Sequence, residues 1–226
     1  MIELQTRYFE GHAVQLFENN RIIFGFTENG FSAAALQRFF KPQPLLFLRQ
    51  IHSAGIVKAR KWQAVSEGDG LILEKPGSVA VIQTADCLPL FFFNSDFTVG
   101  GVIHVGWRGF WQEIEKTLLE LIPGKREDYF FYLGPTIEKK CYPVGDDLYR
   151  LFRDKPCAEK IFTPGRDDKY LMDLKAGLIM SLLNEGIAAA QIQDCDLCTF
   201  CLKNRFPSYR RDGKTGKRIF NFLSLR

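Results

Sequence analysis

The stretch Gly101-Val102-Ile103-His104-Val105-Gly106-Trp107-Arg108-Gly109 decides the fold prediction for this chain. An apolar run, typical of a buried strand, ends at a histidine and turns at once through Gly-Trp-Arg-Gly into an amphipathic segment. We therefore predict a strand over residues 98–105 and a helix over residues 111–122, which Pro123-Gly124 ends. A strand that leads directly into a helix indicates a fold containing both kinds of element.

Further apolar runs predict more strands, over residues 45–52, 79–84, 88–93 and 129–133, with residues 56–60 continuing or pairing with the first. Pro89 cannot donate a ladder hydrogen bond, so we expect the chain to bend near Cys87. Such a bend presents side chains to a cleft instead of a closed ladder.

Two more helices are predicted, one capped by Asp146 or Asp147 and one over residues 174–183 capped by Asp173. Strands and helices intermix without a clean βαβ rhythm, and most strand-to-strand connections are too short for crossover helices. The pattern predicts an α+β fold with a mixed β-sheet flanked by helices, with a doubly wound sheet as the weaker alternative. No linker, low-complexity tract or internal repeat interrupts the chain, which favours a single domain over residues 1–226.

Composition narrows the class of protein. A chain of 226 residues that is 46% hydrophobic can bury a large core. Its 30 basic and 26 acidic residues leave a net charge of +4, which suits an anionic substrate such as phosphate and does not call for nucleic acid. The first residues carry charge and no long apolar block, and no run approaches the roughly 20 residues of a membrane span. Six cysteines without a secretory signal predict reduced thiols in a cytoplasmic protein.

The histidines and one cysteine offer a candidate metal site. His52 and His104 close apolar runs, and Cys87 follows a third such run. Two imidazoles and one thiol are the donors of a catalytic zinc that keeps a fourth position open. These residues are far apart in the sequence, so only the fold can bring them together. The third histidine, His12, belongs to no motif and is expected to be a surface or structural residue.

Charged residues near these positions are candidates for chemistry. Asp86 and Asp69 could orient a ligand imidazole or act as a general base, while capping of a turn is the favoured interpretation for Asp69. Arg108 follows His104 directly, and its guanidinium could bind phosphate in a bidentate fork. Arg210 and Arg211 are weaker candidates, with a solvated basic segment as the alternative.

The remaining cysteines form a possible second metal motif. Cys195, Cys198 and Cys201 have the C-x-x-C-x-x-C spacing that suits zinc or an iron–sulfur cluster. No cysteine or histidine follows, and Cys141 or Cys157 could supply a fourth ligand only through the tertiary fold. The sequence therefore disfavours a second metal site, and Cys141 is expected to pack in the interior.

Taken in order, eight blocks of this sequence resemble one family. They are Gln50-Ile51-His52, Gly68-Asp69-Gly70, Thr84-Ala85-Asp86-Cys87-Leu88-Pro89, His104-Val105-Gly106-Trp107-Arg108-Gly109, Leu133-Gly134-Pro135, Cys141-Tyr142-Pro143-Val144-Gly145, Cys198-Thr199 and Ser208-Tyr209-Arg210-Arg211-Asp212-Gly213. The family is known as laccase-type multicopper polyphenol oxidoreductase, peptidoglycan editing factor, or zinc-dependent purine nucleoside phosphorylase. The resemblance runs from about Phe24 to the C-terminus. It implies a metal held by His52, Cys87 and His104, and a fold distantly like that of bacterial toxin cysteine deamidases.

The resemblance also implies an activity. We expect a zinc-dependent purine nucleoside phosphorylase that uses phosphate and acts on inosine, adenosine and methylthioadenosine, with adenosine deaminase activity. Within the same family, the alternative is an amidase that edits a peptidoglycan precursor. A copper polyphenol oxidase is a third candidate, and copper is the less favoured metal because three histidines cannot build several histidine-rich copper centres. The sequence does not indicate an oligomeric state.

Overall fold

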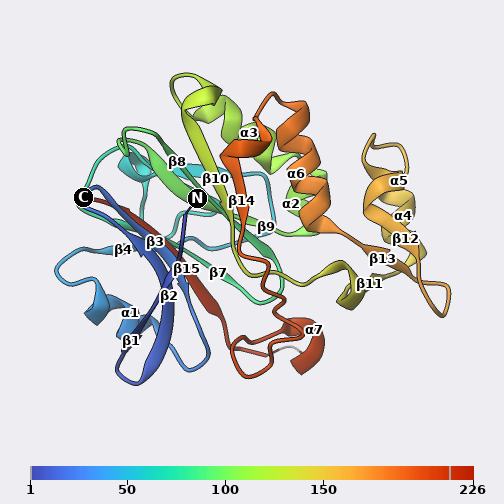
Figure 1. The fold of residues 1–226 in the computed structure, drawn as a ribbon, viewed down its shortest axis with the longest axis horizontal. Helices are drawn as coiled ribbons and strands as arrows, with labels where there is room; N and C mark the ends of the chain where they lie inside the picture. The colour runs from blue at the N-terminus through green and yellow to red at the C-terminus, as the bar shows by residue number, and fades with distance from the viewer. Residues whose placement is uncertain (1, 214) are drawn as a thin grey trace.

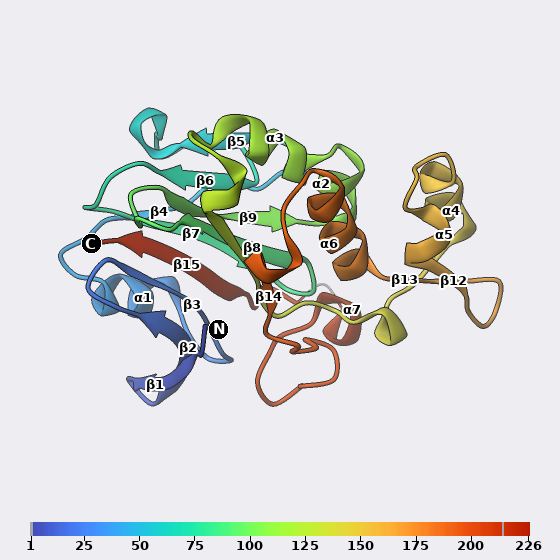
Figure 2. The ribbon, with the colours of Figure 1, turned by 45° about the horizontal axis from the view of Figure 1, so that its top comes forward.

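The computed structural model describes residues 2–213 and 215–226. Two mixed six-stranded sheets lie face to face (Figures 1 and 2). The first sheet has the order β1-β2-β3-β15-β7-β4. Its strands are β1 (Gln5–Phe9), β2 (His12–Glu18), β3 (Ile22–Thr27), β15 (Ile219–Leu225), β7 (Val79–Thr84) and β4 (Leu45–Leu46). The C-terminal strand β15 thus lies between β3 and β7 in the middle of the sheet (Figure 2).

The second sheet has the order β14-β10-β8-β9-β6-β5. Its strands are β14 (Ile192–Asp194), β10 (Tyr129–Leu133), β8 (Leu88–Asn94), β9 (Gly100–Val105), β6 (Gly70–Leu73) and β5 (Ile56–Lys58). In the two sheets the parallel pairs among the described strands are β4–β7, β5–β6 and β10–β14, and the other pairs are antiparallel. Both sheets are therefore mixed.

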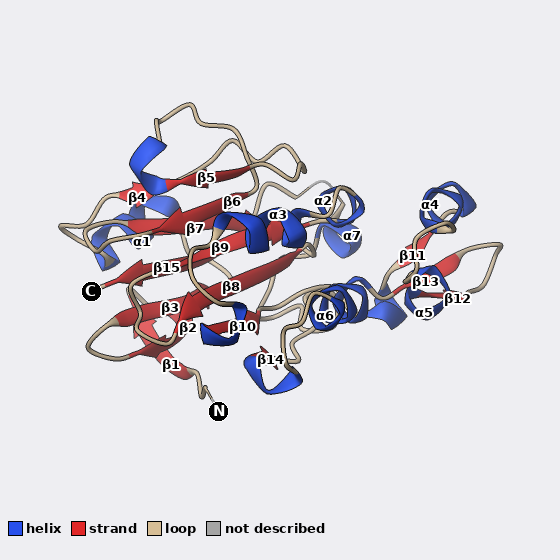
Figure 3. Cartoon of the chain, turned by 90° about the horizontal axis from the view of Figure 1, so that it is seen from above, coloured by secondary structure: helices blue, strands red, loops and turns tan. Residues whose placement is uncertain are grey.

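Helices cover the outer faces of the two sheets. Helix α1 (Ala33–Phe39) packs on the first sheet, and α2 (Trp107–Trp111), α3 (Ile114–Leu121) and α6 (Leu174–Asn184) pack on the second (Figure 1). A small sheet of β11 (Pro143–Val144), β13 (Tyr170–Met172) and β12 (Phe162–Pro164) projects from one end with α4 (Asp146–Phe152) and α5 (Ala158–Ile161) (Figure 3). The remaining elements are α7 (Tyr209–Asp212) and the 3₁₀ helices η1 (Ala59–Lys61), η2 (Arg126–Asp128), η3 (Lys139–Cys141) and η4 (Ala189–Gln191).

The central strands of the second sheet, β8, β9 and β6, are buried on both faces. On β8, Phe91 and Phe93 point to the first sheet, whereas Leu90 and Phe92 point to the helices. Phe24 of the first sheet packs against both inward rings, at centroid distances of 5.3 and 5.4 Å. Alternate side chains of a strand face opposite sides, so β8 needs apolar residues at nearly every position. This explains the continuous apolar runs that predicted β8 and β9.

The α+β class is confirmed, and the sheet prediction needs a correction. There are two mixed six-stranded sheets and a small third sheet, instead of one mixed sheet. The predicted bend at Cys87 is confirmed, because Asp86 has a φ of 91° immediately before β8 begins. Pro89 nevertheless lies inside that strand, opposite His104. The prediction of one domain over residues 1–226 stays a prediction.

Two element boundaries were wrong for local reasons. The predicted helix over 111–122 is two helices, since Glu113 adopts a left-handed φ of 62° between α2 and α3. Helix α4 begins at Asp146 after the cap residue Gly145, so neither Asp146 nor Asp147 caps it from outside. The third predicted helix is confirmed as α6, where the Asp173 side chain accepts a hydrogen bond from the Ala176 N–H. No helix in the described part of the chain is long and apolar enough to cross a membrane.

Candidate metal centre

The chain that carries His52 leaves the first sheet early. The predicted strand over 45–52 pairs with β7 only at Leu45 and Leu46. Beyond that point the Gln50 side chain takes the place of a neighbouring strand. Its amide oxygen accepts a hydrogen bond from the Gln83 N–H (2.7 Å), and its amide nitrogen donates one to the Gln83 carbonyl (2.9 Å). The backbone polar groups of β7 stay satisfied while the chain turns away. His52 can therefore reach the end of the second sheet.

Asp69 fixes the turn at His52. Its carboxylate is fully buried and accepts hydrogen bonds from the backbone N–H groups of Ile51, His52 and Ser53 and from the Ser53 hydroxyl. The backbone of His52 has a φ of 58°, which is unusual for a histidine. Four donors on one carboxylate hold this left-handed turn in place. The turn-capping interpretation of Asp69 is thus confirmed.

The same carboxylate also orients the second imidazole. Oδ1 of Asp69 lies 2.8 Å from Nδ1 of His104, and the Asp69 carbonyl accepts from the His104 N–H at 2.6 Å. Both side chains are buried. An Nδ1–H bonded to a carboxylate leaves Nε2 free to bind a metal, an arrangement common among metal-binding histidines. Asp69 therefore acts on both candidate ligands at once.

The structure brings His52, Cys87 and His104 together. Their ligand atoms all lie within 4.8 Å of one another, and the two imidazole rings meet edge to face with centroids 4.8 Å apart. His104 comes from β9, and Cys87 comes from the turn before β8. Two nitrogens and one sulfur on separate elements form an open three-ligand set, which is the composition of catalytic zinc sites.

The charges of the site favour a thiolate. Burial opposes the charged form of Cys87, but the neighbouring imidazoles of His104 and His52 outweigh burial and lower the pKa of its thiol. Burial also opposes protonation of His104, yet the sulfur of Cys87 and the carboxylate of Asp69 raise the pKa of this imidazole. Both shifts favour the thiolate form of Cys87 and the protonated form of His104. A metal ion would take the thiolate directly and displace the imidazole proton.

Gly106 lets the backbone approach the three residues. A Cβ at this position would lie 3.1 Å from Cδ2 of His52 and 3.2 Å from Sγ of Cys87. These distances are shorter than ordinary van der Waals contact, so a larger residue would push on two candidate ligands. The glycine at the turn between β9 and α2 is therefore part of the site.

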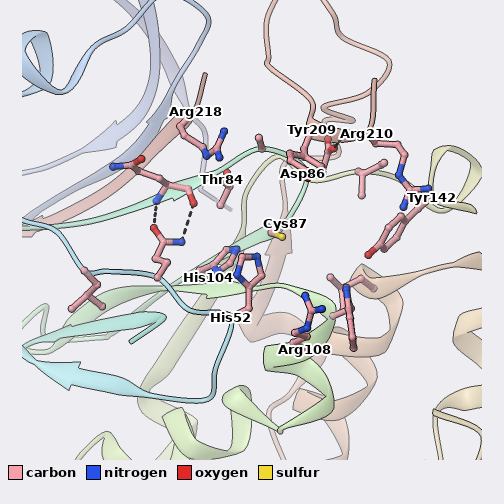
Figure 4. A pocket seen from close by; sticks show the side chains of 17 residues that line it. His52, Thr84, Asp86, Cys87, His104, Arg108, Tyr142, Tyr209, Arg210 and Arg218 are labelled. Carbon is pink, nitrogen blue, oxygen red and sulfur yellow. Dashed lines mark hydrogen bonds between the residues drawn. The ribbon is translucent and has the colours of Figure 1, made fainter. Parts of the chain in front are cut away.

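A cavity of about 600 Å³ opens beside the three residues (Figure 4). This volume lies within the range of small-molecule sites. In Figure 4, His52, His104 and Cys87 lie together at the centre, with Arg108 and Tyr142 on one side and Arg218 on the other. The cavity combines a metal-ligand set with basic side chains.

Arg108 lines the cavity, as its predicted role requires. Its guanidinium lies over the ring of Trp107 at 4.3 Å, and no carboxylate among the described residues pairs with it. Arg210 also lines the cavity, but its guanidinium donates to the Pro143 carbonyl and lies 5.1 Å from the Tyr142 ring. Arg108 is therefore the cation most available to an anion.

Arg211 lies outside the cavity wall. Its guanidinium donates to the carbonyls of Thr199, Phe200 and Phe206 and so ties a loop together. Arg211 is a structural residue in this fold, which corrects its candidacy as a phosphate ligand. His12 lies away from the cavity and packs edge to face against Phe31, which agrees with the expected surface or structural role.

Asp86 lines the cavity, but its carboxylate accepts its hydrogen bonds from the 199–210 segment and not from the imidazoles. Oδ1 accepts from the Thr199 hydroxyl at 2.6 Å, and Oδ2 accepts from the Ser208 hydroxyl and the Arg210 N–H. The Asp86 carbonyl accepts from the Thr136 hydroxyl. Among the two aspartates, Asp69 is the one that contacts a ligand imidazole. Asp86 fastens the 199–210 segment beside Cys87.

Tyr142 was missed as a site residue. The block Cys141-Tyr142-Pro143-Val144-Gly145 was interpreted as packing, yet its tyrosine directs its hydroxyl into the cavity (Figure 4). Burial raises the pKa of the Tyr142 phenol, so it keeps its proton. Arg218 was missed as well, because it lies in a stretch that reads as a solvated basic segment. Only the resemblance of the block Cys141-Tyr142-Pro143-Val144-Gly145 to the family pointed to Tyr142.

The chain thus combines an α+β fold with a His/Cys group that could hold a metal ion, beside a cavity with basic side chains. A family model described as multi-copper polyphenol oxidoreductase laccase matches residues 28–226. The chain therefore belongs to that family, as the sequence blocks predicted.

Curated relatives have a consistent name. The chain is 33% identical to a purine nucleoside phosphorylase of Haemophilus influenzae over 185 residues, which cover 80% of this chain and 75% of the relative. It is 30% identical to the purine nucleoside phosphorylase YfiH of Escherichia coli, over 81% of this chain and 75% of the relative.

Solved structures share the fold. The hypothetical protein YfiH of Bacillus licheniformis superposes with a TM-score of 0.86 at 24% identity, over 94% of this chain and 96% of that one. YlmD of Geobacillus stearothermophilus gives a TM-score of 0.78 at 23% identity, over 91% and 92% of the two chains. The α+β arrangement with mixed sheets is thus shared across these proteins.

The Asp69 interactions predict the effect of Asp69→Asn. The amide nitrogen cannot accept the hydrogen bonds that the carboxylate accepts, so the His52 turn and the His104 ring both lose their support. We expect the zinc affinity of the His52–Cys87–His104 site to fall about 10- to 100-fold. The free energy of unfolding should fall by about 1–3 kcal/mol. Zinc titration against a competing chelator and urea denaturation measure the two effects.

Asp154→Asn is the matched control, because this aspartate is 91% exposed. It should change neither quantity measurably. Unchanged zinc affinity in Asp69→Asn would contradict the role assigned to Asp69.

Proposed function

We propose that this protein is a zinc-dependent purine nucleoside phosphorylase that acts on inosine, adenosine and methylthioadenosine and also deaminates adenosine. The observation that carries the proposal is the convergence of His52, Cys87 and His104 at the wall of a 600 Å³ cavity with Arg108 on its rim. The names of the relatives at 30–33% identity support the same activity.

The donor set fits zinc. One thiolate and two imidazoles suit this ion, and the carboxylate of Asp69 supplies the expected support behind His104. When bound, zinc supplies a Lewis acid and lowers the pKa of a water molecule toward neutrality. Copper chemistry of the laccase type needs several histidine-rich centres. The chain has three histidines, and His12 belongs to neither metal-ligand group of the described residues.

Phosphorolysis requires that phosphate attacks the anomeric carbon of the ribose while the bond to the purine breaks. Arg108 is the proposed phosphate ligand, since a guanidinium binds two phosphate oxygens at once and this one has no competing carboxylate. The departing base takes the electron pair of the broken bond and must be stabilised. Tyr142 keeps its proton and points into the cavity, so we propose that it donates a hydrogen bond to the purine.

Asp86 is proposed as a positioning residue. Its hydrogen bonds to Thr199, Ser208 and Arg210 hold the loop that brings Arg210 to the cavity. Because Asp86 is adjacent to Cys87, the same contacts also fix the turn that carries this ligand. We therefore expect Asp86 to act through its neighbours and not on the substrate.

The test of the proposed function is a product assay with a cysteine control. Inosine plus phosphate should yield hypoxanthine and ribose 1-phosphate, and adenosine should yield inosine. Cys87→Ser should abolish both reactions, because a serine oxygen is a poor replacement for a zinc-bound thiolate. Chromatography of the products measures both activities.

Cys157→Ser serves as the control, because Cys157 belongs to neither metal-ligand group of the described residues. It should retain both activities. A panel with a catechol-type dye and a peptidoglycan precursor covers the two alternatives. Turnover of either panel substrate, with none of inosine, would overturn the proposal.

Arg108→Ala separates the two reactions. Only phosphorolysis must hold an anion, so its kcat/KM should fall about 10²- to 10³-fold, as for the loss of one electrostatic donor in a catalytic site. Deamination of adenosine should fall by less than tenfold. Steady-state kinetics with varied phosphate measures the first effect. Equal losses in both reactions would show that Arg108 positions the nucleoside or the turn instead.

A further inference from the structure

We propose that Cys141, Cys198 and Cys201 form a second metal site, a three-thiolate centre for a zinc-like ion. Their sulfur atoms lie within 4.8 Å of one another, and those of Cys141 and Cys201 are 3.4 Å apart. Zinc–sulfur bonds of about 2.3 Å place the sulfurs of a tetrahedral site roughly 3.8 Å apart. The observed separations, one of 3.4 Å and none above 4.8 Å, lie on either side of this value, so small side-chain shifts would fit such an ion.

The fold builds this cluster from two distant segments. The backbone at Thr136 pairs in parallel with Cys198, through hydrogen bonds from the Thr136 N–H to the Leu197 carbonyl and from the Thr199 N–H to the Thr136 carbonyl. This pairing sets η3, which ends at Cys141, beside the turn that contains Cys198 and Cys201. Hydrogen bonds of the main chain thus hold the three cysteines near one another without a metal.

The composition of the site corrects the sequence interpretation. Cys195 does not join the cluster but packs at the edge of the core between the two sheets. Cys141, expected to be packing, takes its place. No fourth histidine, cysteine or carboxylate of the described residues joins the group, and Cys201 is exposed. Water or a small thiol would complete the coordination from the solvent side.

The position of the cluster gives it a structural role beside the cavity. Cys141 precedes Tyr142 directly, and Thr199, next to Cys198, bonds the carboxylate of Asp86. A metal ion here would cross-link the two segments that carry Tyr142 and the loop held by Asp86. The second site would therefore hold one wall of the cavity without touching the substrate.

The test uses the His104→Ala variant, purified under reducing conditions without oxygen, so that the first centre is disabled. We expect it to bind about one zinc ion per chain by elemental analysis. Adding Cys201→Ser should reduce the bound zinc to near zero, whereas adding Cys157→Ser or Cys195→Ser should leave it unchanged. Thiol titration should find three protected thiols that a chelator exposes.

A second measurement guards against misfolding of the double variants. The otherwise unaltered protein, loaded with Co²⁺, should bind two ions, and Cys201→Ser should bind one and lose most of the sulfur-to-cobalt charge-transfer absorption. Copper(I) in place of zinc in the purified His104→Ala variant would support the site and identify its ion. Absence of metal from folded His104→Ala, or zinc that survives Cys201→Ser, would overturn the proposal. A Cys141–Cys201 disulfide under these reducing conditions would overturn it as well.

Discussion

The candidate metal centre depends on one buried carboxylate. Asp69 accepts hydrogen bonds from the turn that carries His52 and from the imidazole of His104, while its own carbonyl holds the His104 backbone. A buried charge is costly unless hydrogen bonds compensate it, and hydrogen bonds to a charged group contribute about 1.5–3 kcal/mol each. The carboxylate is therefore stable only in the geometry that brings the two imidazoles together.

The sheet architecture leaves room for this site. Val102 of β9 packs between the two sheets, and His104, two residues further on, belongs to the same face of the strand. The first sheet offers no partner there, because β4 has ended at Leu46 and Gln50 satisfies the backbone of β7. The apolar core thus gives way to polar ligands where the strand ends. The cavity occupies the space beyond it.

Much of this could be predicted from the sequence. Continuous apolar runs located β7, β8, β9 and β10, since strands buried on both faces need apolar residues at nearly every position. Four strands of the first sheet were not predicted. β1 and β2 carry exposed or alternating polar residues, and β15 follows a basic stretch, but β3 is a continuous buried apolar run that the same pattern should have located. The sequence also could not show that the pairs β10–β14 and β5–β6 extend a second sheet. Sheet pairing is set by contacts between segments far apart in the chain.

The metal ligands could be named from the sequence, but their convergence could not. His52, Cys87 and His104 stood out as donors at the ends of apolar runs, and the family resemblance grouped them. Only one of the two roles of Asp69 could be predicted. A Gly-Asp-Gly turn predicts a cap, but nothing in it predicts the hydrogen bond to His104. The place of Cys141 in the second cysteine cluster could not be predicted, because its approach to Cys201 arises from the backbone pairing at Thr136.

The central claim is that His52, Cys87 and His104 share one zinc ion. X-ray absorption spectroscopy at the zinc edge tests it most directly, on a variant in which Cys141, Cys198 and Cys201 are all replaced by serine. The account predicts one sulfur at about 2.3 Å and two imidazole nitrogens at about 2.0 Å, with one further light atom. A zinc shell without sulfur, or one without imidazole, would contradict it.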